Sequence, residues 1–164
     1  MPNIYKSVDW AVAIANDSAH GYDQEHRNGP DYDCSSFVST ALEKGGFKIS
    51  PYSWTGNMVQ QLKNCGFYEV PVYGERQLGD VFIHTAHHVV MCVDKNRIVQ
   101  ASINEFGGIT GGTPGDQTGR EIYICPFYKP PYGWEYHLRP PKAAYTPESL
   151  EEPKQTKEFI ISWR

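Results

Sequence analysis

The residues Tyr-Asp-Cys-Ser-Ser at positions 32–36 place a cysteine at the expected start of an amphipathic helix. The thiolate is the reactive form of cysteine, and the positive end of a helix dipole favours it. Cysteines in such positions can have pKa values lowered to roughly 3.5–7.5. The polar neighbours of Cys34 also argue against deep burial. Cys34 is therefore a candidate nucleophile, although a free cysteine is more often a small buried hydrophobic side chain.

A histidine at the start of an apolar strand is the candidate partner for this thiol. His88 opens the apolar run 88–93. A strand would hold its imidazole rigidly toward a cleft while alternate neighbours enter the core. Histidine commonly acts as a general base. His84 and His87 are alternatives that could equally be ordinary surface or core residues.

A glutamine supplies a possible third member. Gln100 lies twelve residues after His88, with a predicted turn at 94–96 between them. A three-residue turn pairs Val93 with Arg97, which puts Gln100 diagonally across from His88 on one face of the hairpin. An amide there could hold the imidazole by its second ring nitrogen. The alternative is a solvent-exposed strand residue.

The elements that must position these residues change type along the chain. The apolar spacing predicts helices over 7–18, 34–44 and 56–64, with Ser7 and Thr55 as candidate caps. Short apolar runs predict strands over 81–83, 88–93, 97–102, 121–125 and 136–139. The glycine-rich residues 103–120 predict a long loop, and its part from about Gly107 to Gly119 is expected to shape the substrate groove. Helices followed by strands predict an α+β fold, with N-terminal helices packed on a central antiparallel sheet.

Composition limits the class of protein. The chain has 164 residues, 40% hydrophobic and 21% charged, which is typical of one globular domain. The net charge is -4 and no basic block occurs, so we expect no nucleic-acid partner. No apolar run reaches the ~20 residues needed to span a membrane, and no signal peptide is evident. Residues 1–140 form the expected catalytic domain, and the Pro-rich and Glu-rich residues 141–164 form a linker or tail.

Metal chemistry is not expected. No Cys-x-x-Cys and no His-Glu-x-x-His occurs, and Cys65, Cys92 and Cys125 are expected to be reduced, mostly buried thiols. His87 and His88 are adjacent, so a strand would point them to opposite faces. Three loop aspartates lack recognisable calcium-binding spacing: Asp17, Asp23 and Asp31. We therefore predict that the protein needs no metal and no cofactor.

Taken together, the candidate segments resemble the NlpC family of papain-like cell-wall cysteine peptidases. Residues 33–38 (Asp-Cys-Ser-Ser-Phe-Val), the Gly-Asp at 79–80 and the strand after His88 occur in the family's order. The chain is most similar to the phage-type peptidoglycan amidohydrolases, or endolysins, which often carry segments like 115–121 and 134–139. The resemblance implies that Cys34 is the nucleophile and His88 the base. Gln100 would orient the base, where many relatives have histidine.

The resemblance also implies residues that bind substrate. They are Tyr32, Asp33, Ser35, Trp54 and His87. Asp33 could pair with a substrate amine or only cap the helix. Trp54 could wall the groove or pack in the core. The backbone N–H of Cys34 is the expected oxyanion donor.

The implied function is hydrolysis of an amide bond in the peptidoglycan stem peptide by a phage or prophage lysin. The bond could be the lactyl–L-alanine amide or one after D-glutamate or D-glutamine. Bacterial peptidoglycan is the expected partner of a monomer, with a separate wall-binding domain or subunit as a further possibility. Such a protein would insert in no membrane. It would be made in the cytoplasm, be released by a holin or another route, and act on the cell wall. The alternatives are an idle wall-binding or phage structural module, a toxin acting on a protein amide, and a metal hydrolase.

Overall fold

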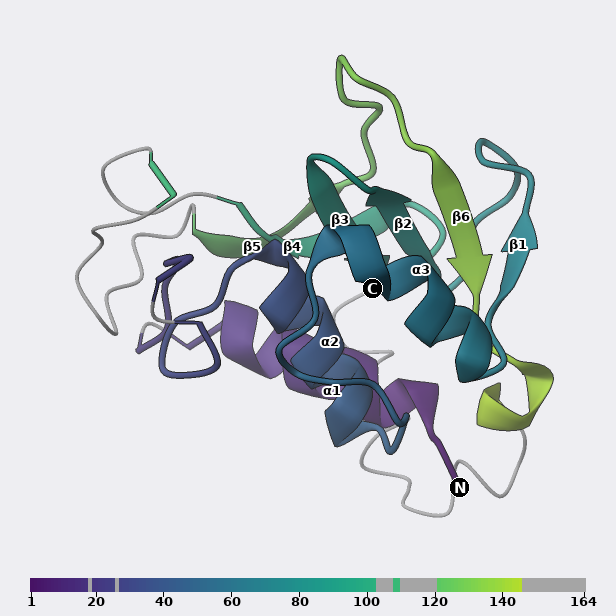
Figure 1. The fold of residues 1–164 in the computed structure, drawn as a ribbon, viewed down its shortest axis with the longest axis horizontal. Helices are drawn as coiled ribbons and strands as arrows, with labels where there is room; N and C mark the ends of the chain where they lie inside the picture. Colours follow the sequence, from purple (N-terminus) through teal and green to yellow (C-terminus); the bar gives the residue numbers. More distant parts are fainter. Residues whose placement is uncertain (18, 26, 103–107, 110–120, 146–164) are drawn as a thin grey trace.

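The protein has three helices followed by a six-stranded sheet (Figure 1). The computed structural model describes residues 1–17, 19–25, 27–102, 108–109 and 121–145. The helices are α1 (Ile4–Ala15), α2 (Cys34–Lys44) and α3 (Thr55–Asn64). The strands are β1 (Tyr68–Val70), β2 (Val81–His84), β3 (His88–Cys92), β4 (Arg97–Ala101), β5 (Ile122–Pro126) and β6 (Tyr136–Arg139). A short 3-10 helix, η1 (Lys142–Tyr145), follows the last strand.

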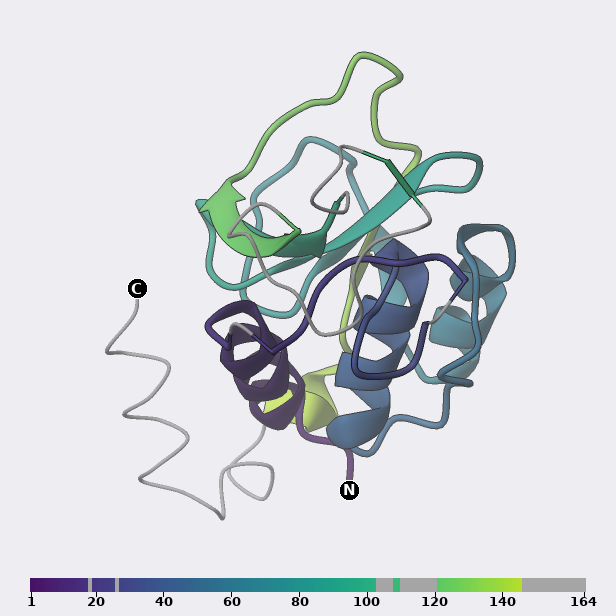
Figure 2. The ribbon, with the colours of Figure 1, turned by 90° about the vertical axis from the view of Figure 1, so that its left-hand side faces the viewer.

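The strands form one antiparallel sheet in the order β1-β6-β2-β3-β4-β5. Helices α1 and α2 lie side by side against one face of this sheet, with α2 next to β3 and β4 (Figure 2). Odd-numbered strand residues such as Val89 and Val99 join the helices in the main core. Even-numbered residues such as Val90 and Ile98 form a second apolar cluster with Trp134 on the opposite face. The expected α+β architecture is confirmed.

The start of α2 is fixed by reciprocal hydrogen bonds. The Asp33 carboxylate accepts from the backbone N–H of Ser36 at 2.8 Å, and the Ser36 hydroxyl accepts from the backbone N–H of Asp33 at 3.0 Å. This capping box satisfies donors that a helix N-terminus otherwise leaves without partners. It holds Cys34 as the first helical residue, which confirms the predicted start of this helix.

Two other helix starts differ from the prediction. Helix α1 begins at Ile4 rather than residue 7, because the Asn3 side chain accepts from the N–H groups of Tyr5 and Lys6 and is the true cap. Helix α3 begins at Thr55, with the Asn57 side chain accepting from the N–H of Trp54. Strand β1 was not predicted. It has three residues and is held by its pairing with β6, which no local pattern reveals.

The chain continues to pack after residue 140. Ala144 in η1 is buried, and the Tyr145 hydroxyl donates to the carbonyl of Leu78. The Tyr145 ring also meets Tyr5 edge-on at 6.0 Å. We therefore propose that the catalytic domain extends to Tyr145. The remaining tail, residues 146–164, lies outside the described residues, as does most of the glycine-rich segment 103–120.

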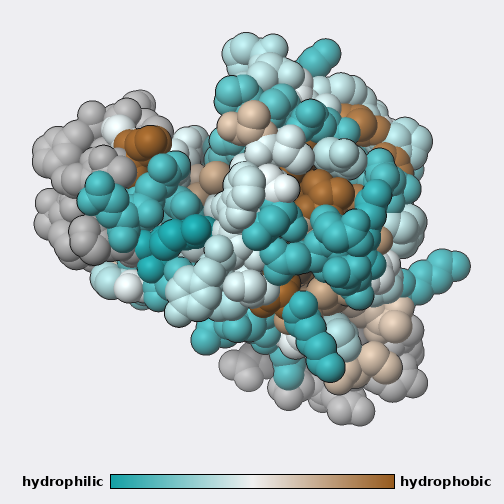
Figure 3. Space-filling view, viewed as in Figure 1, coloured by the Kyte–Doolittle hydropathy of each residue, from teal (hydrophilic) through white to brown (hydrophobic). Residues whose placement is uncertain are grey.

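On the face seen in Figure 3, the described residues are mostly hydrophilic, and hydrophobic ones show in small separate patches. Broad apolar patches usually mark docking surfaces, and the described part of this face has none. No helix among the described residues has the length and apolar character needed to cross a membrane.

Candidate active site

The β3–β4 hairpin brings two of the predicted site residues together. Cys92 pairs with Ile98, and the N–H of Val93 donates to the carbonyl of Arg97 at 2.9 Å, so the predicted hairpin register is confirmed. On the even-numbered face, His88 Nε2 lies 2.8 Å from Gln100 Oε1. Both side chains are buried. Strand pairing therefore sets the distance between this imidazole and this amide.

The direction of this hydrogen bond defines the tautomer of the histidine. An amide oxygen can only accept, so Nε2 of His88 carries the hydrogen and Nδ1 of the neutral ring is the free acceptor. Burial lowers the pKa of His88, and the bond to Gln100 partly opposes that shift. The imidazole is therefore neutral near pH 7 and has an unprotonated nitrogen, as a general base requires.

Two tyrosines hold the amide of Gln100. The Tyr128 hydroxyl donates to Oε1 at 2.8 Å, and Nε2 donates to the Tyr123 hydroxyl at 3.0 Å. These bonds favour the orientation in which Oε1 faces His88. Sequence reasoning missed both tyrosines. Tyr123 pairs directly with Gln100 across β4 and β5, so a predicted pairing of these two strands would have identified Tyr123. Tyr128 lies beyond the end of β5, where strand pairing gives no information.

Cys34 lies at the same end of β3 as His88. The backbone N–H groups of Val89 and Ser35 are hydrogen-bonded to its sulfur. Burial, followed by the charge of Asp33, raises the pKa of the Cys34 thiol to about 12, although these two N–H groups and Arg27 oppose the rise. In its resting state Cys34 is therefore a neutral thiol.

The expectation of a lowered pKa and an exposed cysteine is wrong for a physical reason. Only 7% of Cys34 is exposed, and Ser35 and Ser36 are buried too. Their hydroxyls are satisfied within the cap and its contacts, so polar neighbours did not require exposure here. Burial disfavours the thiolate more strongly than the backbone N–H groups at the start of the helix favour it.

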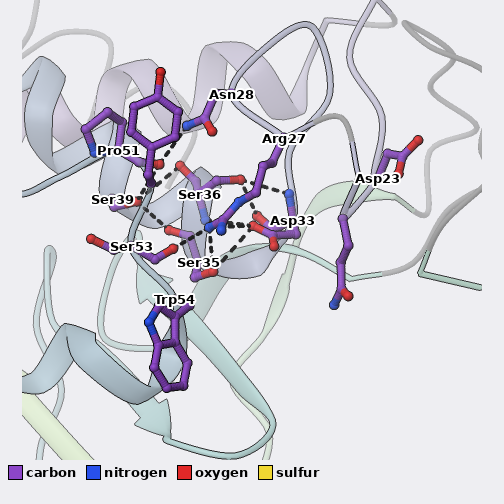
Figure 4. Close-up of polar contacts among 12 residues, drawn as sticks. Asp23, Arg27, Asn28, Asp33, Ser35, Ser36, Ser39, Pro51, Ser53 and Trp54 are labelled. Atoms are coloured by element: carbon purple, nitrogen blue, oxygen red, sulfur yellow. Dashed lines mark hydrogen bonds and ion pairs between the residues drawn. The ribbon is translucent and has the colours of Figure 1, made fainter.

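Arg27 joins the loop before α2 to the start of that helix. Its guanidinium Nη2 donates to the Ser35 hydroxyl at 3.0 Å and to the carbonyl of Ser53, and lies 3.2 Å from the Asp33 carboxylate (Figure 4). The indole of Trp54 points away from this cluster and is 57% exposed. Asp33 thus caps the helix, which is the simpler of its two expected roles, and it also forms an ion pair with Arg27.

Comparison with known proteins decides the family. Residues 3–113 match the profile of the family described as "Bacteriophage peptidoglycan hydrolase". The chain belongs to this family. Residues 98–154 also match the "Endolysin-like domain". This peptidoglycan hydrolase therefore acts on the bacterial cell wall, and peptidoglycan is its substrate.

The fold of this peptidoglycan hydrolase also has a solved relative. The P60 domain of an antigen from M. avium subspecies paratuberculosis superposes with a TM-score of 0.51 and 17% sequence identity. The match covers 82% of this chain and 93% of that domain, which confirms the expected NlpC-type fold. No curated protein matches the chain significantly.

The other predicted substrate-binding residues of this hydrolase occupy different surroundings. Tyr32 is 7% exposed and packs against Trp10 and Phe37, with ring centroids 5.4 and 6.3 Å away. It belongs to the core, so we do not carry it into the proposed site. His87 is exposed and stacks on Tyr132 at 4.5 Å.

Two further tyrosines of this hydrolase lie close to the candidate nucleophile. Burial raises the pKa of both Tyr22 and Tyr132, and the nearby Cys34 sulfur adds to the rise. Both hydroxyls therefore remain protonated near pH 7. The sequence offered no signal for either, since each lies in a loop. Tyr22 is held by a contact far along the chain, its N–H donating to the Glu121 carboxylate at 3.0 Å.

Acidic groups in the described parts of the hydrolase serve structural contacts. Asp17 and Asp31 accept from the N–H groups of Ala19 and Gly21, both at 2.9 Å. The buried Asp80 carboxylate lies 2.6 Å from His137 Nε2 and 2.9 Å from an Arg139 nitrogen. Among the residues that the structure describes, no group of three or more histidine, cysteine, aspartate or glutamate side chains is arranged to hold a metal.

Proposed function

We propose that this chain hydrolyses an amide bond in the stem peptide of peptidoglycan by covalent cysteine catalysis. Cys34 is the nucleophile, His88 the general base and Gln100 the residue that orients the base. The proposal is supported above all by the 2.8 Å hydrogen bond from His88 Nε2 to Gln100 Oε1. A catalytic base needs this kind of partner on its second ring nitrogen.

In the first half of the reaction, the Cys34 sulfur attacks the carbonyl carbon of the scissile amide. Nδ1 of His88 takes the thiol proton as the carbon–sulfur bond forms. The resulting imidazolium keeps its Nε2 hydrogen bond to Gln100. The tetrahedral oxyanion is stabilised by nearby donors, for which the backbone N–H of Cys34 and the Tyr22 hydroxyl are our candidates. His88 then protonates the leaving amine, and a thioester remains on Cys34.

In the second half, water attacks the thioester. His88 accepts a proton from that water, which becomes the nucleophile at the acyl carbon. The carbon–sulfur bond breaks, and the proton held by His88 restores the Cys34 thiol. The product leaves as a carboxylic acid, which loses its remaining proton to solvent. The sulfur must be deprotonated only during attack, so a raised thiol pKa is compatible with turnover when the base lies close to it.

The decisive experiment is digestion of purified peptidoglycan with the unaltered chain and three variants, followed by mass spectrometry of the fragments. We expect Cys34→Ala to release no fragment above background. His88→Ala should lose about 100- to 10,000-fold in rate. Gln100→Ala should lose less, about 10- to 150-fold, the range for one hydrogen bond to a charged group.

Cys65→Ala is the matched control, because Cys65 is a free, half-buried thiol at the far end of α3. It should cleave at the normal rate. If Cys34→Ala cleaves normally while its fold is intact, the cysteine mechanism is wrong. Cleavage of a protein amide with none of peptidoglycan would instead support a toxin. Wall binding without fragments from the unaltered chain would support an idle binding module.

The route to the wall and the assembly state are parts of the same proposal. We propose a monomer that is made in the cytoplasm, released by a holin or another route, and assisted by a separate wall-binding domain or subunit. Sedimentation velocity tests the monomer. Wall binding by the Cys34→Ala variant tests whether this chain holds peptidoglycan without assistance.

A further inference from the structure

Four aromatic or imidazole rings extend outward from the candidate base. Trp134 is stacked with His88 at 6.1 Å, and Tyr132 meets Trp134 edge-on at 6.2 Å. His87 stacks on Tyr132 at 4.5 Å, and His84 lies 4.6 Å from His87 and 5.0 Å from Tyr132. We call Trp134, Tyr132, His87 and His84 the aromatic shelf. It joins the β2–β3 turn to the loop between β5 and β6.

The aromatic shelf begins beside the candidate base and reaches solvent at its outer rings. Its innermost ring, Trp134, is buried and stacks on His88. Tyr132 is nevertheless 39% exposed. A large apolar ring exposed beside a reactive centre is a natural contact for substrate.

The shelf is held in place before any ligand arrives. The N–H of Gly133 donates to the carbonyl of Pro130 at 2.9 Å, and Gly133 has a φ of 75° that favours glycine in this turn. The N–H of Trp134 donates to the Tyr73 hydroxyl and its indole N–H to the carbonyl of Tyr128, both at 2.9 Å. A preorganised surface loses little conformational freedom on binding.

The chemistry of the shelf favours a neutral ring with hydroxyl and amide groups. Glu135 is half-exposed beside it, 3.7 Å from His84 Nδ1, with its carboxylate accepting from the N–H and hydroxyl of Thr85. That negative charge disfavours the carboxylates of a stem peptide. A sugar instead offers a flat C–H face for the rings, and its hydroxyl and N-acetyl groups suit the imidazole and carboxylate edges.

We propose that the aromatic shelf binds an N-acetylated sugar ring of the glycan strand during catalysis. This inference rests on the proposed function of Cys34 and His88. A sugar held on the shelf places the peptide attachment point toward the sulfur. The amide cleaved is then the lactyl–L-alanine bond next to that sugar, and the protein is an amidase rather than an endopeptidase.

Two substrates that share the scissile amide test this proposal. One is a disaccharide-lactyl-tetrapeptide, and the other is the lactyl-tetrapeptide without sugar. We expect Tyr132→Ala to raise KM for the disaccharide substrate by roughly 3- to 10-fold, the range for one aromatic contact. Its kcat/KM on the sugar-free substrate should stay within about twofold. Tyr132→Phe keeps the ring and should restore the KM. Tyr68→Ala, at an exposed tyrosine on β1, is the matched control and should change neither value.

The outcomes separate the shelf from the cysteine mechanism. Equal effects of Tyr132→Ala on both substrates, or no effect on either, would overturn the sugar site. Cleavage only after D-glutamate or D-glutamine by the unaltered chain would also overturn it and leave the cysteine mechanism standing. If the unaltered chain cleaves neither substrate nor whole wall, the proposed function fails. In that case, calorimetry of the Cys34→Ala variant with the disaccharide substrate still tests the shelf. Weakening of the binding by roughly 3- to 10-fold on adding Tyr132→Ala would support the sugar site, and unchanged binding would overturn it.

Discussion

The ionisation of Cys34 gives a quantitative prediction for chemical modification. Burial raises the pKa of this thiol to about 12, so the resting sulfur is mostly protonated up to about pH 10. Iodoacetamide reacts with the thiolate. We therefore expect its rate of reaction with Cys34 to climb about tenfold for each pH unit from pH 6 to pH 10, without a plateau.

The size of the effect follows from the same pKa. The pKa of Cys34 is raised from 9.0 to about 12, so the folded protein has roughly 1,000-fold less thiolate at pH 7 than an ordinary thiol. A more basic thiolate is a better nucleophile, with a Brønsted coefficient of about 0.4–0.5, which offsets roughly 15- to 30-fold of that loss. Cys34 should therefore react roughly 30- to 70-fold more slowly than the same residue in the unfolded chain, before any steric hindrance.

The assay is mass spectrometry of the Cys34 peptide after timed exposure to iodoacetamide, in folded protein and in protein unfolded with urea. The half-buried Cys65 and Cys125 report on general access to reagent in the same samples. The slope with pH is decisive, because hindrance slows the reaction equally at every pH. A plateau below pH 8, or faster reaction in the folded protein, would show that a thiolate–imidazolium pair is the resting state and refute this reasoning.

Three further expectations are independent of alkylation. His88 must be neutral to accept the thiol proton, and burial lowers its pKa, so kcat/KM should fall with decreasing pH only below pH ~6.5. The bond to Gln100 raises the His88 pKa, so Gln100→Ala should move this fall to still lower pH. A fall centred at or above pH ~6.5 would contradict this expectation. Activity on wall should survive treatment with a chelator, whereas loss with recovery on adding zinc would point to a metal hydrolase. Tyr145→Phe removes the hydrogen bond to Leu78 and should lower the free energy of unfolding, measured by urea titration, by about 0.5–1.5 kcal/mol. Wall cleavage should stay unchanged. An unchanged free energy of unfolding would mean that this contact of η1 does not stabilise the domain.

The half of the candidate site that lies on a hairpin was predictable. Side chains alternate along a strand, and a three-residue turn fixes which residues face each other. The relation between His88 and Gln100 therefore needed only their spacing and the turn between them. The start of α2 was predictable for a similar reason, because Asp33 and Ser36 are three residues apart in the chain.

The features that were missed depend on residues brought together from distant parts of the chain. The pKa of Cys34 is set mainly by burial under the packed fold, and no local pattern gives that. Tyr128 reaches Gln100 across 28 positions in the chain, and the N–H of Tyr22 reaches Glu121 across 99. Strand β1 exists only because β6 returns beside it. Such contacts follow from the finished fold rather than from neighbouring residues.

Because the contact between His88 and Gln100 depends on the pairing of β3 with β4, catalytic activity also reports whether the sheet has assembled in its native register. A slip of β4 by one residue against β3 would turn Gln100 to the helix side and put Val99 or Ala101 in the position diagonal to His88 that Gln100 occupies in the native register. The slipped sheet would keep the circular dichroism of a normal one, yet its base would lose its partner. The specific activity of a refolded sample would therefore be proportional to the fraction of molecules in which β3 and β4 have paired in the native register.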